Sequence, residues 1–232
     1  TAEVYDPQTD GWQPLAKMMT ARGALGLAAV GGKIYAIGGS TGDTALESVE
    51  AYDPQLDAWA PVASMSGKRM FHASVVLDGK IYAIGGFAGG ALDTVEVYDP
   101  QADSWQQVAS IPQGLDSHTA TAMGGKIYVT GGLGVQEDDD DDNDDDDDDN
   151  DVTLNLVYVY DPQANAWTQL ASMGNVRQIH ASAAVGGKLY VFGGLSASKF
   201  LSAAEVYDPA SNSWAQVTSL TSARGNMVAV TL

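Results

Sequence analysis

Two short stretches decide the fold: residues 79–86 have the sequence GKIYAIGG, and residues 95–100 have the sequence VEVYDP. Trp105 follows Tyr98 by seven residues. An apolar run that ends in a glycine pair indicates a buried strand, and Asp-Pro indicates a strand that ends in a turn. Asp78-Gly79 separates two apolar runs, which is a strong hairpin signal. We therefore predict four short strands, over 71–77, 80–84, 94–98 and 104–108.

The same pattern recurs along the chain, so an internal repeat is the first feature to interpret. The sequence Tyr-Asp-Pro occurs five times, starting at Tyr5, Tyr52, Tyr98, Tyr160 and Tyr207. Successive occurrences are 47, 46, 62 and 47 residues apart. A Trp follows each of these Tyr by seven residues: Trp12, Trp59, Trp105, Trp167 and Trp214. A four-stranded sheet of this size cannot bury its own two faces, and stacking such sheets around an axis buries both. We therefore predict an all-β propeller with Tyr and Trp packed between blades.

The combination of GKIYAIGG, VEVYDP and the following Trp resembles the kelch repeat. The segment 48–65 is especially similar to the Kelch-like proteins, which carry BTB and BACK domains upstream of their propeller and act as substrate adaptors of cullin-type ubiquitin ligases. The resemblance covers the chain except 134–152. It implies a kelch β-propeller of four-stranded antiparallel blades, whereas fold alone does not imply function.

The strand signals divide the single domain 1–232 unevenly. Residues 1–19 hold only a third and a fourth strand, and residues 224–232 supply one further first strand. Four full blades lie between them, at 22–66, 69–112, 116–173 and 177–219. In the Kelch-like family the last first strand closes the ring by pairing with the N-terminal blade. We therefore expect an incomplete closing blade with strands from both termini, in an N-terminally truncated ring. An open ring exposes strand edges, so a neighbour would cover that edge.

An acidic tract accounts for most of the net charge of −19. Glu137 and twelve Asp between 138 and 151 supply 13 acidic residues, and outside them 17 acidic residues face 11 basic ones. Like charges at this density, with no apolar residue among them, predict a disordered insertion over 134–152. Three interpretations stay open: a solvated spacer, a contact for a basic partner, and weak Ca²⁺ binding. The tract lacks the central Gly and the terminal Glu of a 12-residue EF-hand loop.

Four arginines occupy one repeat position, in the segment that enters the first strand: Arg22, Arg69, Arg177 and Arg224. Strand alternation puts this segment on the same face as the loop between strands two and three. We call it the first face; in the Kelch-like family it binds substrate. A ring of guanidinium groups there would clamp an acidic peptide, and the acidic tract would compete with that peptide. In the alternative interpretation each Arg caps local carbonyl groups or packs on a neighbouring blade. The third full unit has Leu115-Asp116 in place of Arg.

Two other sets share a repeat position. The residues directly after the glycine pairs are candidate partner contacts, with loop packing as the alternative: Ser40, Phe87, Leu133 and Leu195. The three histidines of the chain also align: His72, His118 and His180. If they converge on the central channel, they are weak candidates for Zn or Cu binding. Leu25 and Met227 at the matching positions of other units favour packing instead.

Several function classes are excluded by what the chain lacks. It has no basic footprint for nucleic acid and no apolar run long enough for a membrane span. It has no Cys, which excludes a Cys nucleophile and the Tyr–Cys cofactor of kelch copper oxidases. No Ser-His-Asp set, Walker loop or dinucleotide fingerprint is present. We therefore expect no cofactor and no catalytic residues.

The prediction is a non-enzymatic module that binds a partner peptide or protein through the first face. If the resemblance extends to the whole parent protein, the module would be the substrate adaptor of a ubiquitin ligase, and we expect it in the cytoplasm. The main alternative is a structural or scaffolding subunit of a larger assembly. A weaker alternative is a kelch enzyme that acts on sugars.

Overall fold

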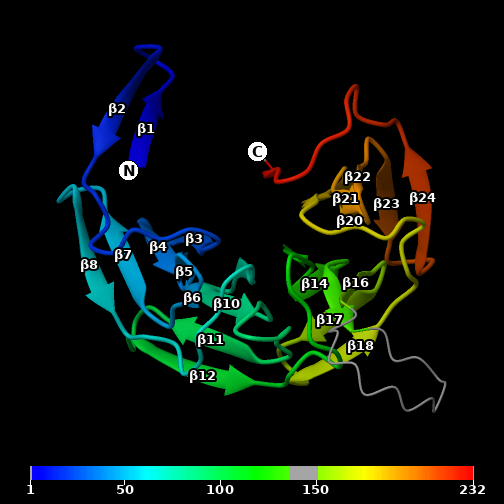
Figure 1. Cartoon of the computed structure of the whole chain (residues 1–232), viewed down its shortest axis with the longest axis horizontal. Helices are drawn as coiled ribbons and strands as arrows, with labels where there is room; N and C mark the ends of the chain where they lie inside the picture. The colour runs from blue at the N-terminus through cyan, green and yellow to red at the C-terminus, as the bar shows by residue number, and fades with distance from the viewer. Residues whose placement is uncertain (1, 136–150, 232) are drawn as a thin grey trace.

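The computed structural model describes residues 2–135 and 151–231. The regular elements of these residues are all β-strands, and none of the residues described forms a helix long and apolar enough to cross a membrane. Four antiparallel sheets of four strands follow one another around an arc (Figure 1). This arrangement confirms the predicted all-β kelch-type propeller of four-stranded blades.

Each blade pairs its strands in chain order from the inside of the arc outward. Blade 1 consists of β3 (Gly26–Val30), β4 (Lys33–Ile37), β7 (Val49–Asp53) and β8 (Ala58–Val62). Blade 2 consists of β9 (Ala73–Leu77), β10 (Lys80–Ile84), β11 (Val95–Asp99) and β12 (Ser104–Val108). Blade 3 consists of β13 (Thr119–Met123), β14 (Lys126–Thr130), β17 (Val157–Asp161) and β18 (Ala166–Gln169). Blade 4 consists of β19 (Ala181–Val185), β20 (Lys188–Phe192), β23 (Ala204–Asp208) and β24 (Ser213–Val217).

Short hairpins extend three of the loops between the second and third strands. They are β5 (Ser40–Thr41) with β6 (Thr44–Ala45), β15 (Leu133–Val135) with β16 (Asp151–Thr153), and β21 (Leu195–Ser196) with β22 (Lys199–Phe200). The chain begins with a separate hairpin of β1 (Ala2–Asp6) and β2 (Gly11–Leu15).

The strands of blade 2 follow the prediction closely, except that the third is shifted by one residue, to Val95–Asp99, and the first begins two residues late. Phe71 adopts a left-handed backbone with φ of 55°, which a strand residue cannot have. Its N–H donates to the Ala24 carbonyl, and its own carbonyl accepts from the Ser117 N–H. The series continues in the next blades: the Ile179 N–H donates to the Ser117 carbonyl, and the Asn226 N–H donates to the Ile179 carbonyl. A belt of backbone hydrogen bonds therefore links the entry segments of successive blades.

The predicted Tyr and Trp positions form the packing between blades. In blade 2 the rings of Tyr98 and Trp105 lie 5.1 Å apart, and the Trp105 indole N–H donates to the Ala63 carbonyl at the end of blade 1. The same bond recurs for Trp59, Trp167 and Trp214. Trp12, in the N-terminal hairpin, is 67% exposed.

The two ends of the chain lie apart at the open side of the arc (Figure 1). Residues 224–232 were predicted to form a closing first strand, but residues 224–231 form no strand. The physical reason is that a first strand is held by the second strand of its own blade, and the N-terminal hairpin supplies only β1 and β2. Val228 and Val230 are consequently 90% and 77% exposed.

Candidate functional site

The first face forms as the strand directions predict. In each blade the residue after the glycine pair bridges to the entry segment: Ser40 with Gly23, Phe87 with Met70, Leu133 with Asp116, and Leu195 with Gln178. Ser40, Phe87, Leu133 and Leu195 are each partly exposed. Their backbones are thus held in place while their side chains reach the surface. Their role as partner contacts stays a prediction.

The guanidinium groups of Arg22, Arg69 and Arg177 lie inside the protein, where their side chains are at most 1% exposed. Arg69 is typical: Nη1 donates to the carbonyls of Gly85 and Thr94, at 2.7 and 3.0 Å. These are the first glycine of the pair and the residue before the third strand. The predicted guanidinium clamp is therefore wrong for these three arginines, because their side chains are buried and their Nη1 and Nη2 groups donate within their own blades. They follow the alternative of local carbonyl capping.

Each of these arginines also pairs with a buried glutamate in the third strand of its blade. Arg22 Nη2 lies 2.7 Å from Glu50 and Arg69 Nη2 lies 2.8 Å from Glu96, and Arg177 pairs with Glu205. The glutamates also accept hydrogen bonds from backbone N–H groups that lie just before the entry segment. In blade 1 the N–H groups of Met19 and Thr20 donate to the Glu50 carboxylate. Burial opposes ionisation of Glu50, but these bonds and Arg22 outweigh it and hold the pKa of its carboxyl below the usual value. We call this arrangement the Arg–Glu network.

Arg224 differs from the other three, because it is exposed and its side chain donates to Ser222. It lies in the C-terminal segment that follows β24. Its place in a partner-binding rim stays a prediction.

Blade 3 replaces the whole Arg–Glu network at once. Leu115 occupies the position of the arginine and Tyr158 that of the glutamate, and both are buried in one apolar cluster. Pro112, which has no N–H, occupies the position where Ser66 donates to Glu96 in blade 2. The prediction from sequence noted Leu115 but missed Tyr158 and Pro112. Comparing all three repeat positions together would have revealed the coordinated change.

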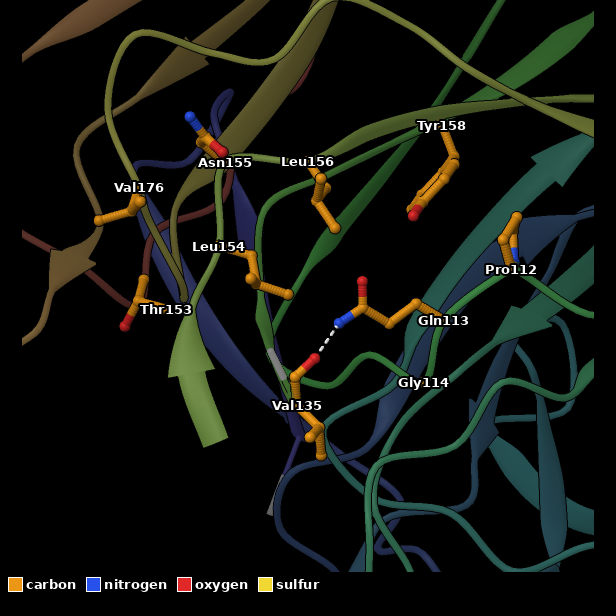
Figure 2. A pocket seen from close by; sticks show the side chains of 10 residues that line it. All are labelled: Pro112, Gln113, Gly114, Val135, Thr153, Leu154, Asn155, Leu156, Tyr158 and Val176. Carbon is orange, nitrogen blue, oxygen red and sulfur yellow. Dashed lines mark hydrogen bonds between the residues drawn. The ribbon is translucent and has the colours of Figure 1, made fainter. Parts of the chain in front are cut away.

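A pocket of about 690 Å³ opens where the network is missing (Figure 2). It lies between the segments that enter blades 3 and 4, and it is lined by residues 112–114, Val135, residues 153–156, Tyr158 and Val176. The Gln113 side-chain amide donates to the Val135 carbonyl across its mouth. The Asn155 side-chain amide donates to the Met173 carbonyl at 2.9 Å. The pocket therefore belongs to the first face and has mixed apolar and polar walls.

The acidic insertion begins and ends at this pocket. Val135, which lines it, pairs with Asp151 in the β15–β16 hairpin. Residues 134–135 and 151–152 are strand residues, which corrects the prediction of disorder over 134–152 at both ends. Hairpin pairing orders these residues because each backbone group gains a partner. The rest of the predicted insertion lies outside the described residues, and so does its predicted contact with a basic partner or Ca²⁺.

His72, His118 and His180 line a central hollow of about 520 Å³, and all three are buried. Burial lowers the pKa of His72 to about 3 and that of His118 to about 4. His180 Nε2 lies 3.1 Å from the Thr119 hydroxyl and 2.8 Å from that of Thr130. In the described ranges, no three His, Cys, Asp or Glu side chains are arranged to hold a metal ion.

His118 and His180 instead pack against the glycine pair of the neighbouring blade. A Cβ at Gly85 would lie 2.8 Å from His118 Cε1, and one at Gly131 would lie 2.9 Å from His180 Cε1. Both glycines have φ of 58°, so any other residue there would also be strained. This packing agrees with the alternative interpretation of the aligned histidines.

Comparison with protein families finds kelch repeats along the chain. The KLHDC2/KLHL20/DRC7 Kelch-repeats domain matches residues 2–132. Kelch motifs match residues 114–174 and 180–221. Together these matches cover all four blades and the N-terminal hairpin.

Curated relatives match over about one repeat. Human Kelch-like protein 5 is 45% identical over 47 residues, which is 20% of this chain and 6% of that protein. Kelch-like protein 7 from Gallus gallus is 46% identical over 50 residues, which is 22% of this chain and 8% of that protein. The matched segments are thus a small part of the relatives' lengths. Among solved structures, YjhT superposes with a TM-score of 0.73 at 19% identity, over 91% of this chain and 69% of that one, which shows a shared fold.

Proposed function

Because this chain belongs to the kelch-repeat family of β-propellers, we propose that it is a non-enzymatic module that binds a protein or peptide partner through its first face. Kelch propellers typically serve as protein-interaction modules. One observation carries the proposal: the segments that differ from blade to blade lie on the first face. The entry segments, the added hairpins and the blade-3 pocket all lie there, whereas the other face has the tight glycine and Asp-Pro turns. Loops held on a rigid scaffold are where binding residues concentrate.

The finer proposal is that the parent protein is a substrate adaptor of a ubiquitin ligase. It is supported by the similarity to Kelch-like proteins over single repeats. In that arrangement the propeller selects the substrate and other domains carry the ligase contact.

A structural role in a larger assembly is the second candidate, and the open side of the arc favours it. Tyr5 and Trp12 in the N-terminal hairpin, and Val228 and Val230 near the C-terminus, are exposed apolar side chains. Exposed apolar patches of this kind mark interaction sites. In this case the partner would cover the open edge and not the first face.

Quantitative affinity purification with three matched variants tests the proposal. The first-face variant is Phe87→Ala with Leu195→Ser, the opposite-face variant is Gln55→Ala with Gln101→Ala, and the open-edge variant is Trp12→Ser with Val228→Ser. We expect the first-face variant to lose the partners that the other two retain. Loss of partners with the open-edge variant alone would overturn the proposal in favour of the structural role. Thermal melting of each variant serves as the folding control.

A further inference from the structure

We infer that the inner edge of β1 binds an extended segment of another protein, which adds to the N-terminal hairpin as a further strand. The segment carries a lysine, an aliphatic residue and a tyrosine in succession. This inference concerns the N-terminal hairpin and not the first face, so it does not depend on the proposed function. It begins from the likeness between the hairpin and the outer half of a blade.

The hairpin pairs as the two outer strands of a blade do. Tyr5 is opposite Trp12 in β1 and β2, just as Tyr52 is opposite Trp59 in β7 and β8. The Tyr5 hydroxyl also donates to the side chain five residues further on, as its counterpart in blade 1 does. β1 is the inner strand of the hairpin, and among the described residues it pairs with β2 alone (Figure 1). The hairpin therefore presents the edge on which every full blade has its second strand.

The hairpin is also held where the outer half of a blade belongs. Ala16, at its end, donates its N–H to Asp57 and accepts from the Trp59 indole, at 2.9 Å each. The same two bonds join blade 1 to blade 2 through Ala63. In blade 1 the second strand, β4, lies against blade 2. A strand that pairs with β1 would lie against blade 1 in the same way.

Side chains that are buried in the full blades are exposed on both sides of this position. Tyr5 is 42% exposed, whereas its four counterparts are at most 3% exposed: Tyr52, Tyr98, Tyr160 and Tyr207. On the facing side, Ile34 in β4 is 40% exposed. Its counterparts in the other blades are fully buried: Ile81, Ile127 and Leu189. A strand beside β1 would place one side chain next to Tyr5 and the following one toward Ile34.

The full blades define which residues pair with this edge. In each of them a lysine of the second strand lies 2.9 to 3.4 Å from the Asp of Tyr-Asp-Pro: Lys33, Lys80, Lys126 and Lys188. An aliphatic residue lies opposite the Tyr, and a tyrosine lies opposite the residue before it. Asp6 is the Asp of the hairpin, and in the described part of the chain no lysine pairs with it. Charge complementarity therefore selects a lysine beside Asp6, followed by an aliphatic residue opposite Tyr5 and a tyrosine opposite Val4.

We place the occupant on another chain because the described residues offer no free segment of this kind. They contain four segments with the pattern, and each is already paired on both sides within its own blade. In strand addition, main-chain hydrogen bonds to a free edge give affinity and the alternating side chains give specificity. One added strand would satisfy the edge of β1, the charge of Asp6 and the exposed apolar side chains together.

Fluorescence anisotropy with a second-strand peptide tests the inference on the whole chain. The probe is fluorescein-labelled GKIYAIGG, the sequence of residues 79–86. In one control peptide both isoleucines are replaced by serine, and in the other the lysine is replaced by glutamate. The serine peptide should bind about tenfold more weakly, because it buries less apolar surface. The glutamate peptide should bind about threefold more weakly, because an exposed ion pair contributes little.

Two variants assign the binding to this edge. Asp6→Lys should reverse the charge preference, so that the glutamate peptide binds more tightly than the probe. Ile34→Ser should weaken both peptides about fivefold, because it removes apolar surface that the added strand covers. The matched controls are Asp43→Lys in the β5–β6 turn and Val185→Ser in blade 4, which change exposed residues elsewhere and should leave both affinities unchanged. Thermal melting of each variant is the folding control.

Hydrogen exchange locates the bound peptide. The probe should slow exchange of the β1 amides and leave those of β24, the outer edge of blade 4, unchanged. Equal protection of β24 would mean that the peptide adds to any free strand, and this would overturn the inference. Equal affinity for the three peptides would overturn it as well.

Sedimentation velocity examines the remaining occupant, a second copy of this chain. We expect a monomer, because the second strands of a second copy are paired in their own blades. Self-association that Asp6→Lys or Ile34→Ser abolishes would make a second copy the occupant and would overturn the inference. None of these outcomes bears on the first face, which is judged by Phe87→Ala with Leu195→Ser.

Discussion

Blades 2 and 3 are the same repeat built with two different interiors. Their second strands are almost identical, KIYAI in β10 and KIYVT in β14. Blade 2 buries Arg69 and Glu96 at 1% exposure each, whereas blade 3 buries Leu115 and Tyr158 in the same places. Both keep the backbone bond from the second glycine of the pair to the next entry segment, Gly86 to Leu115 and Gly132 to Arg177. The comparison teaches that the backbone hydrogen bonds between blades are kept in both blades. The buried Arg–Glu network, in contrast, can be replaced by apolar and aromatic side chains without a change of fold.

Breaking the network of blade 2 should have the largest effect. Glu96→Gln leaves the buried Arg69 guanidinium without a countercharge, although its bonds to Gly85 and Thr94 remain. Removing one partner of a buried ion pair typically costs about 3–5 kcal/mol of unfolding free energy. Urea denaturation monitored by Trp fluorescence would measure the loss.

The exposed pair of Lys80 and Asp99 in the same blade is the control for this measurement. Its atoms lie 3.0 Å apart, but the lysine side chain is 48% exposed. Lys80→Ala should change stability very little, because water screens such pairs. A Glu96→Gln loss no larger than that of Lys80→Ala would contradict the assigned role of the network.

Converting blade 2 to the blade-3 interior should have an intermediate effect. The double variant Arg69→Leu with Glu96→Tyr should be more stable than the sum of its single variants predicts, by about 1–3 kcal/mol, because the residues are in direct contact. Adding Ser66→Pro completes the exchange, since the Ser66 N–H donates to Glu96 and would lose that acceptor. Strict additivity in a double-mutant cycle would show that the blade-3 filling depends on more than these positions.

The inner histidines should show the smallest effect, again with a difference between the two blades. His118 packs on blade 2, which has Ala73 and Ile84 where blade 3 has Thr119 and Thr130. His180→Leu loses its contacts with both threonine hydroxyls and should cost about 1 kcal/mol at pH 7. His118→Leu should cost less at that pH, because leucine already occupies this repeat position at Leu25.

The same histidine makes stability depend on pH. Burial lowers the pKa of His118 to about 4 in the folded chain, from about 6.5 when unfolded. The unfolded state therefore binds more protons between these values, so the stability is fully present above pH 6.5 and is lost as the pH falls toward 4. His118→Leu should flatten this part of the profile in urea titrations at a series of pH values. An unchanged slope would mean that His118 is not a buried neutral group.

Much of the fold could be predicted because its signals are local. The Asp78-Gly79 turn, the strand 80–84 and the Tyr98–Trp105 pair each follow from a few adjacent residues and a repeat spacing. The start of β9 at Ala73 was missed because the left-handed Phe71 is imposed by hydrogen bonds to Ala24 and Ser117 in other blades. A contact with another blade leaves no mark in the residues around position 71.

The candidate site was predicted less well, for a related reason. The alignment of Arg22, Arg69 and Arg177 in one repeat position was visible in the sequence. An arginine is expected there both for a circle of guanidinium groups on the first face and for a buried ion pair, so the residue type does not distinguish the two. Only the glutamate partner, some 27 residues further on, decides between them. The pocket of blade 3 depends on Pro112, Leu115 and Tyr158 together, and these come from two separate segments.

The amino-acid sequence by itself determined the strand order, the repeat and the first face, because hydrophobic period, glycine pairs and Asp-Pro turns act over a few residues. Only the tertiary structure decided which polar groups are buried. Burial depends on what the neighbouring blade places against each side chain, and this is why Arg69 lies in the interior, Trp12 lies in solvent and Tyr158 faces an open pocket.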